Sequence, residues 1–284
     1  MTDAASKLEP VSAAAARLCP ICRGAMTDAF DAVVLQRHRA QYENCSGCGF
    51  LRARDPHWLE EAYSSAIAAT DTGLVARNTE LARKVASLLY FTAGERGAGR
   101  YLDAAGGYGL LTRLMRDRGM DFYWADKYCE NLLARGFEFK PELAPCRAVT
   151  AFEVMEHLED PAGFVAEVLA DARSGMFIFT TVLFEGAPPP AEWWYYAFAT
   201  GQHIAFFQRR TLATLARKLG LHFYSASGLH LFSADPLSSL RLRIGAGRLS
   251  HLLAPLARAA LGGKTQPDHE EITRRLQAAR GAPD

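Results

Sequence analysis

The stretch that decides the fold reads Tyr101-Leu102-Asp103-Ala104-Ala105-Gly106-Gly107-Tyr108-Gly109. The apolar residues before Ala105 predict a short strand, the glycines predict a tight turn, and the leucine spacing from Leu110 onward predicts a helix. Glycines at such a turn let the backbone approach a ligand closely, and the helix N-terminus adds unpaired N–H donors. The stretch therefore predicts the ligand-binding unit of an α/β protein.

A second acid follows at the end of the next predicted strand. Asp126 closes the apolar run 122–125 and lies 23 residues after Asp103, where an acid can accept both hydroxyls of a ribose. The dinucleotide fingerprint G-x-G-x-x-G fails, because its third glycine position is Thr112. An acid two residues before the turn instead suits a ligand with an amino acid end, whose ammonium needs a nearby carboxylate.

Strands and helices alternate through the middle of the chain. Further apolar runs at 148–152, 176–181, 222–225 and 229–232 predict strands, and helices are expected around 163–171 and 212–219. Alternation of this length implies a largely parallel sheet with helices on both faces.

The glycine stretch resembles the D-x-G-x-G-x-G motif of class I S-adenosylmethionine (SAM)-dependent methyltransferases, with Ala105 in place of the first glycine. The segment 153–161, Glu-Val-Met-Glu-His-Leu-Glu-Asp-Pro, is similar to the E-V-L-E-H-L-x-D-P block of ubiquinone-type and sugar methyltransferases. The resemblance implies an α/β fold with a Rossmann-like sheet of seven strands, and SAM as the cofactor. It places Glu153 beside that cofactor and His157 toward the acceptor.

The same resemblance implies roles for the residues around the turn. The methionine end of SAM is expected at Asp103 and the turn, and its ribose at Asp126. Tyr128 and Phe152 would flank the adenine. The full set of predicted cofactor residues is Asp103, Ala105, Gly106, Gly107, Gly109, Asp126, Tyr128, Phe152 and Glu153.

A third block, residues 201–207, reads Gly-Gln-His-Ile-Ala-Phe-Phe and follows the aromatic run 193–196. It is similar to an E-H-x-x-x-F segment of zinc-bearing sugar C-methyltransferases, in which a Glu-His pair serves the acceptor. Gln202 replaces that Glu and cannot take a proton. His203 can take a proton, since the ordinary pKa of histidine is about 6.5. We predict His203 as general base with His157 as second choice; the alternative for each is a structural histidine.

Four of the six cysteines predict a metal site near the N-terminus. Cys19 and Cys22, then Cys45 and Cys48, give the spacing C-x2-C-x22-C-x2-C. Two such knuckles supply four thiolates in tetrahedral geometry, which suits Zn²⁺ and leaves no open position for catalysis. We therefore predict a small zinc-ribbon module with a structural metal. Its arginines exceed its acids only slightly, which permits contact with RNA without requiring it.

Composition limits the function classes. The chain has 284 residues, 49% of them hydrophobic, and a net charge of +1, which gives no strong signal for nucleic-acid binding. No apolar run is long enough to span a membrane, and the first residues lack the apolar core of a signal peptide. Cysteines in metal-type pairs without an export signal favour the cytoplasm.

We expect four regions: a flexible leader (1–17), the zinc module (18–55), the methyltransferase domain (56–237) and a helical extension (238–284). In the extension, leucines at helical spacing are surrounded by arginines. Such a helix lies either on a membrane or partner, as a peripheral contact, or against the catalytic domain. Residues 264–284 are expected to form a polar helix or a loose tail.

The expected function is SAM-dependent methylation, on carbon or oxygen, of a small acceptor such as a nucleotide-linked sugar. Two alternatives stay open at this point. One is a zinc-bearing methyltransferase of RNA bases, and the other is a degenerate methyltransferase fold that serves as a binding module. Ala105 and Gln202 are the departures that keep the second alternative open.

Overall fold

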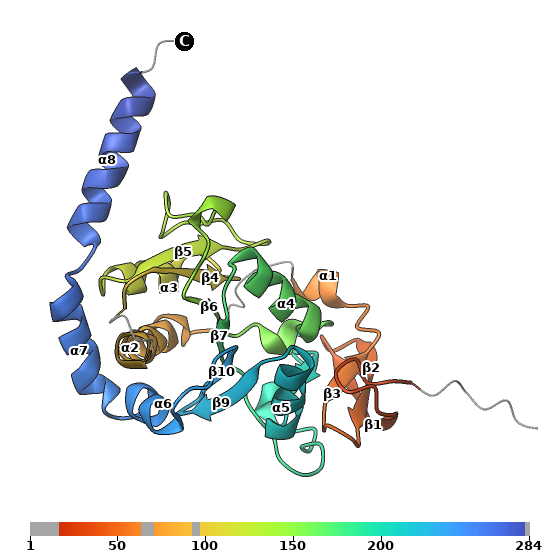
Figure 1. The fold of residues 1–284 in the computed structure, drawn as a ribbon. Coiled ribbons are helices and arrows are strands. Elements are labelled where there is room, and N and C mark those ends of the chain that lie inside the picture. The colour runs from red at the N-terminus through yellow and green to blue at the C-terminus, as the bar shows by residue number, and fades with distance from the viewer. Residues whose placement is uncertain (1–16, 64–70, 93–96, 282–284) are drawn as a thin grey trace, which may run out of the picture.

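Two sheets organise the protein (Figure 1), and the computed structural model describes residues 17–63, 71–92 and 97–281. The larger sheet has the strand order β5-β4-β6-β7-β10-β9. Its first four strands are parallel, and β10 runs antiparallel to both β7 and β9. The strands are β4 (Arg100–Ala104), β5 (Asp121–Ala125), β6 (Ala148–Ala151), β7 (Met176–Phe179), β9 (His222–Ala226) and β10 (Leu229–Ser233).

Both faces of this sheet are buried. Successive side chains of a strand point to opposite faces, so the strands contribute apolar residues to both. Phe177 and Phe179 belong to the apolar cluster of one face, and Ile178 between them belongs to the cluster of the other. The first cluster includes residues of α4 (Pro161–Asp171) and α5 (Arg209–Lys218), and the second includes α2 (Leu74–Thr92) and α3 (Leu110–Arg116). The predicted α/β fold with helices on both faces is confirmed.

The number of strands differs from the expected seven, since the larger sheet has six strands within the described residues. Beyond β5, Trp124 and Glu138 form only an isolated parallel bridge. Gly136 adopts a left-handed φ of +87° just before this bridge, and a short 3-10 helix, η1 (Pro141–Leu143), begins just after it. Proline lacks an N–H donor for a sheet ladder, so the pairing that a seventh strand would need stops after one residue pair.

The smaller sheet joins the N-terminal strands to a segment from much later in the chain. Its order is β1-β2-β3-β8, with β1 (Met26–Val34), β2 (His38–Cys45), β3 (Leu51–Arg54) and β8 (Ala205–Phe206). Phe206 pairs with Leu51 across the β3–β8 boundary. Helix α1 (Leu59–Ala62) follows this region of the chain. Just before it, the indole N–H of Trp58 donates to the carbonyl of Gly201 at 2.8 Å. The division into a zinc module (18–55) and a methyltransferase domain (56–237) stays a prediction. The smaller sheet contains strands from both of these predicted regions.

Three helices form the C-terminal extension: α6 (Ser239–Ala246), α7 (Ser250–Leu261) and α8 (Thr265–Gly281). Helix α7 packs on α2 and buries Ala254 and Ala257, yet Leu252 and Leu256 on its opposite side are exposed. Helix α8 is polar and leads away from the large sheet in Figure 1.

The first turn of α8 is anchored by a buried ion pair. The Asp268 carboxylate accepts two hydrogen bonds from the Arg116 guanidinium, at 2.7 and 2.8 Å, and contacts Arg113 at 2.8 Å. No helix among the described residues is long and apolar enough to cross a membrane. The predicted leader lies almost wholly in residues 1–16, outside the described part of the chain.

Candidate active site

The glycine turn between β4 and α3 leaves its backbone open at one residue. Ala105, Gly107 and Gly109 all have positive φ, of +54°, +54° and +86°. A side chain at Gly109 would meet Asn131 at 2.7 Å, whereas one at Gly107 would meet no atom of the described residues within 4 Å. Gly109 is therefore required for packing, and Gly107 leaves space for a ligand.

Asp103 lies beneath this turn and is 2% exposed. Its two carboxylate oxygens accept hydrogen bonds from the hydroxyls of Thr112 and Thr150, both at 3.0 Å. Burial raises the pKa of Asp103 to about 7, against the opposing effect of the two hydroxyl donors. A bound ammonium group would favour the charged form of this carboxylate, and the role of Asp103 in binding such a group stays a prediction.

Asp126 ties the loop after β5 to the glycine turn. Its carboxylate accepts backbone N–H bonds from Gly107 at 2.9 Å, Tyr128 at 2.7 Å and Cys129 at 2.8 Å. A carboxylate offers about four lone-pair sites, so the three N–H donors leave room for about one ribose hydroxyl, and a second hydroxyl would have to replace one of them. The Tyr128 side chain is 83% exposed, and its predicted stacking on adenine stays a prediction.

Sequence reasoning missed Trp124 as part of the turn. Its indole N–H donates to the carbonyl of Gly107 at 2.7 Å, and its ring lies 2.8 Å from the position a Gly106 side chain would take. The ring is only partly buried. Its place near the end of β5, two residues before Asp126, is the sequence feature that could have indicated this role.

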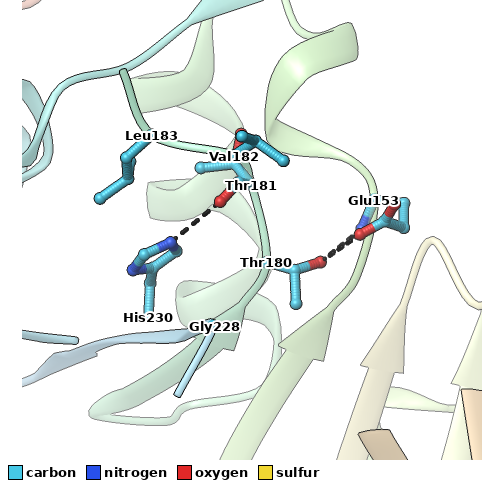
Figure 2. Close-up of a pocket in the computed structure, with 7 residues that line it drawn as sticks. All are labelled: Glu153, Thr180, Thr181, Val182, Leu183, Gly228 and His230. Atoms are coloured by element: carbon cyan, nitrogen blue, oxygen red, sulfur yellow. Dashed lines mark hydrogen bonds between the residues drawn. The ribbon is translucent and has the colours of Figure 1, made fainter. Parts of the chain in front are cut away.

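A cavity of about 390 Å³ opens beside the ends of β6 and β7 (Figure 2). Glu153 lines it and has a left-handed φ of +56°, although it is not glycine. Its carboxylate accepts from the Thr180 hydroxyl at 2.7 Å, and that hydroxyl accepts from the Glu153 backbone N–H at 3.0 Å. Backbone strain of this kind gathers at functional sites. Phe152, which precedes Glu153, is partly buried.

The cavity is lined by Glu153, Thr180, Thr181, Val182, Leu183, Gly228 and His230. Figure 2 shows His230 reaching the carbonyl of Thr181, at 3.0 Å. The other ring nitrogen of His230 pairs with the Ser225 hydroxyl at 3.1 Å. Because both nitrogens have partners, His230 has a structural role.

The two predicted acceptor-side histidines lie together. His157, in the 3-10 helix η2 (Met155–His157), and His203 have ring centroids 4.9 Å apart. The Nδ1 of His157 pairs with the carbonyl of Gln202 at 3.0 Å, and the Nδ1 of His203 with the carbonyl of Tyr195 at 2.6 Å. A carbonyl only accepts, so each Nδ1 carries the proton and each Nε2 is left as an acceptor. Burial lowers the pKa of both histidines, which favours these neutral forms.

Glu156 is the group that sequence reasoning did not single out. It is fully buried, and neither carboxylate oxygen has a hydrogen-bond partner among the described residues. Burial and the charge of Glu153 raise the pKa of Glu156 to about 7. One carboxylate oxygen and one ring nitrogen each from His157 and His203 lie within 4.8 Å of one another.

Gln202 and the aromatic run 193–196 support this cluster. The Gln202 side-chain amide donates to the carbonyl of Ala62 at 2.8 Å, so it holds α1 rather than facing the histidines. Tyr195 is buried and pairs with the Thr181 hydroxyl at 3.2 Å, while Trp194 is exposed. The run is therefore mainly a covering of the small sheet.

A family model described as "Methyltransferase domain" matches residues 76–226, just over half of the chain. The chain belongs to this methyltransferase family. The matched segment contains the glycine turn, the E-V-M-E-H block and the loop with His203. No curated protein matches the chain.

Several solved structures of methyltransferases are similar to this methyltransferase domain at low identity. TnmH is 19% identical with a TM-score of 0.43, and the match covers 63% of this chain and 61% of TnmH. CalO1, a methyltransferase of calicheamicin biosynthesis with bound SAH, is 14% identical with a TM-score of 0.42, over 64% of this chain and 60% of CalO1. Magnesium protoporphyrin IX methyltransferase from Synechocystis PCC 6803, with bound SAH, is 14% identical with a TM-score of 0.40. That match covers 62% of this chain and 91% of the Synechocystis protein. The chain thus spans about three-fifths of TnmH and CalO1.

The four predicted metal-binding cysteines meet next to the methyltransferase domain. The sulfur atoms of Cys19, Cys22, Cys45 and Cys48 lie within 4.8 Å of one another. The closest pairs are Cys22–Cys45 at 3.4 Å and Cys19–Cys48 at 3.6 Å. A tetrahedral zinc with Zn–S bonds of about 2.3 Å separates its sulfurs by about 3.8 Å, so the donor set fits this metal.

Backbone groups around the cysteines complete the fit. The N–H groups of Gly24 and Cys48 approach the sulfurs of Cys22 and Cys45 at 3.4 and 3.5 Å. The Thr211 hydroxyl of α5 donates to the carbonyl of Cys48 at 2.7 Å, which fixes the second knuckle on the methyltransferase domain. The remaining thiols, Cys129 and Cys146, lie apart from this cluster.

Proposed function

We propose that the protein is a SAM-dependent methyltransferase that acts on a small-molecule acceptor, such as a nucleotide-linked sugar or a related metabolite. The observation that carries this proposal is the open backbone at Gly107 above the buried Asp103 carboxylate, at the carboxyl end of β4. Ligands of open parallel sheets bind at this edge. Membership of the methyltransferase family supports the same reading.

Asp103 and the turn 105–109 would hold the methionine end of SAM, and Asp126 its ribose. Phe152, Glu153 and Tyr128 would border the adenosine. When bound, SAM supplies an electrophilic methyl group, so the protein has two tasks: to align the acceptor and to favour its deprotonated form.

The acceptor side is formed by His203 and His157. His203 has a buried, neutral imidazole whose Nε2 can take a proton, which supports its predicted role as general base. His157 is the second choice, for the same reason. Oxygen and carbon acceptors both remain compatible with such a base.

We also propose that the four cysteines bind a structural zinc ion. The sulfur distances and the backbone N–H donors support this reading, and a four-thiolate site leaves no position for a substrate. Elemental analysis of the purified protein tests it. Zinc in the wild type, with one ion per chain fewer on Cys22→Ser substitution, is the expected result.

The RNA alternative receives little support from the charges of the N-terminal region. Arg17 pairs with Glu43 at 3.2 Å, Arg52 pairs with Glu43 at 2.8 Å, and Arg37 pairs with Glu61. Arginines held by acids on their own surface add little to a phosphate-binding field. Cytoplasmic localisation and a membrane contact through α7 stay predictions.

Titration calorimetry with SAM tests the function directly. Wild type is expected to bind SAM, and Asp103→Asn should weaken that affinity at least tenfold, because the neutral amide cannot pair with an ammonium group. Asp31→Asn, at an exposed aspartate on β1, is the matched control and should bind normally. Absence of heat at high SAM concentration would instead favour the degenerate binding module.

A further inference from the structure

A second cluster of metal-ligand side chains lies on the acceptor side, away from the four cysteines. It consists of Glu156, His157 and His203, whose ligand atoms lie within 4.8 Å of one another. Two of these side chains come from the segment after β6 and the third from the segment before β8. The backbone N–H of Ile204 donates to the carbonyl of Glu156 at 2.8 Å, which holds the two segments together.

The histidines are oriented as metal ligands are. A ligating histidine almost always donates its other ring N–H to a carbonyl or carboxylate, which fixes its tautomer and its direction. His157 does so toward Gln202, and His203 toward Tyr195. In both, Nε2 is the nitrogen left with its lone pair.

The burial of Glu156 supports a metal site independently of how the histidines are oriented. A fully buried carboxyl group without a hydrogen-bond partner is costly in its charged form, and native proteins neutralise such a group with a proton, a counter-charge or a metal. A divalent cation between the three side chains would satisfy the carboxylate and both nitrogens at once.

We infer that Glu156, His157 and His203 form a binding site for a divalent transition-metal cation, such as Zn²⁺ or Mn²⁺. Two imidazoles and one carboxylate are a ligand set that such ions accept while keeping exchangeable positions. The site differs from the four-cysteine cluster in two respects: its donor atoms are nitrogen and oxygen instead of sulfur, and it supplies three side-chain ligands instead of four.

The chemical role of this ion rests on the proposed function. A hydroxyl bound to a divalent cation has a lowered pKa and releases its proton to water more readily. The ion would then replace His203 as the activating group, and His203 would be a ligand. This favours an acceptor that reacts through oxygen.

Metal binding itself can be measured on the full chain without any acceptor. Mn²⁺ is the first probe, because thiolates bind it weakly and the four cysteines will not compete for it. Electron paramagnetic resonance of free Mn²⁺ should show one bound ion per chain. Equilibrium dialysis against Zn²⁺, followed by elemental analysis, should show two ions per chain, one in each cluster.

Three variants locate the site. Glu156→Gln keeps the shape of the side chain and removes its charge. His157→Asn and His203→Asn keep a donor near the position of Nδ1 and remove the ligating Nε2. Each should weaken Mn²⁺ binding at least tenfold and reduce bound zinc from two ions to one. His222→Asn, an exposed histidine on β9, is the matched control and should retain both ions.

The remaining zinc in each variant reports that the N-terminal region is still folded. No bound Mn²⁺ together with one zinc in the wild type, or unchanged binding in all three variants, would overturn the inference. Calorimetry with SAM on the same samples separates the two proposals. SAM binding without a second metal contradicts only this site, and a second metal without SAM binding contradicts only the proposed function.

Discussion

The four-cysteine cluster and the carboxyl edge of the large sheet hold their polar groups in opposite ways. At the cysteines, sulfur atoms gather at metal-binding distances and receive backbone N–H groups. At the sheet edge, Asp103 and Glu156 are buried carboxylates with raised pKa values, and Ala105 and Glu153 have left-handed backbones. The first region is arranged to stabilise the chain, whereas the second retains unfavourable features.

The difference indicates how a bound ligand would change the free energy of unfolding in each region. A closed metal site adds its binding energy to folding in the resting protein. Buried charge and backbone strain at an open edge persist only where the surrounding structure enforces them, and a ligand can offset them when it arrives. Substitutions at the cysteines should therefore destabilise the chain, and those that remove charge or strain at the edge should stabilise it.

The largest expected effect is that of Cys45→Ser. Cys45 is fully buried, and a hydroxyl cannot replace its thiolate as a ligand of the proposed zinc ion. We expect the free energy of unfolding to fall by more than about 4 kcal/mol, as is typical when a metal site is lost. Urea denaturation measures this. Cys129→Ser, outside the cluster, should change the same quantity by less than about 1 kcal/mol, and equal losses would contradict a metal-bound cluster.

Asp103→Asn should give the next largest effect, with the opposite sign. The folded-state pKa of Asp103 is about 7, above the usual unfolded value of about 3.9, so the folded chain binds more protons between these values. Wild-type stability therefore falls as pH rises from about 4 to about 7. The variant lacks this loss and should be more stable than wild type at pH 8, by on the order of 3 kcal/mol.

Urea unfolding without SAM, at about pH 5 and about pH 8, checks this sign. The stability difference between variant and wild type should grow with pH. Parallel pH profiles for the two proteins would show that burial does not shift the pKa of Asp103.

Gly49→Ala tests the packing of the second cysteine knuckle. Gly49 has a φ of +77°, and an added Cβ would lie 2.4 Å from the buried Gln208 side chain. Left-handed backbone and steric overlap together should cost about 2 kcal/mol. Gly220→Ala is a matched control, since Gly220 has a φ of +72° with no atom of the described residues within 4 Å. If both variants lose the same stability, contact with Gln208 is not what requires glycine.

The smallest expected effect is a gain from Ala105→Gly. Ala105 has a φ of +54° at the position where the motif of related methyltransferases has glycine. Relief of left-handed strain, reduced by the greater freedom of glycine in the unfolded chain, should stabilise the protein by about 1 kcal/mol. Thermal denaturation measures it, and a lower melting temperature would indicate that the methyl group makes a useful contact.

Local features could be predicted from the sequence, and long-range ones could not. The strand, turn and helix around Gly107 depend on neighbouring residues. The two-residue spacing within each cysteine pair is likewise a local feature that predicts a metal-binding turn. The burial of Glu156 depends on a loop 48 residues later in the chain, whose Ile204 N–H donates to the Glu156 backbone carbonyl. The described residues lack the expected seventh strand where Gly136 and Pro141 follow one another closely, and neither residue alone excludes a strand.

Strand β8 also could not be predicted, because two residues carry no periodicity. Its pairing with β3 has a practical consequence for shortening the chain. Excising residues 17–55 would leave Phe206 without the strand that covers it, and the segment that presents His203 without a fixed neighbour. The N-terminal region therefore supports the segment that carries His203, and a shortened protein should lose the arrangement of His157 and His203 before it loses its central sheet.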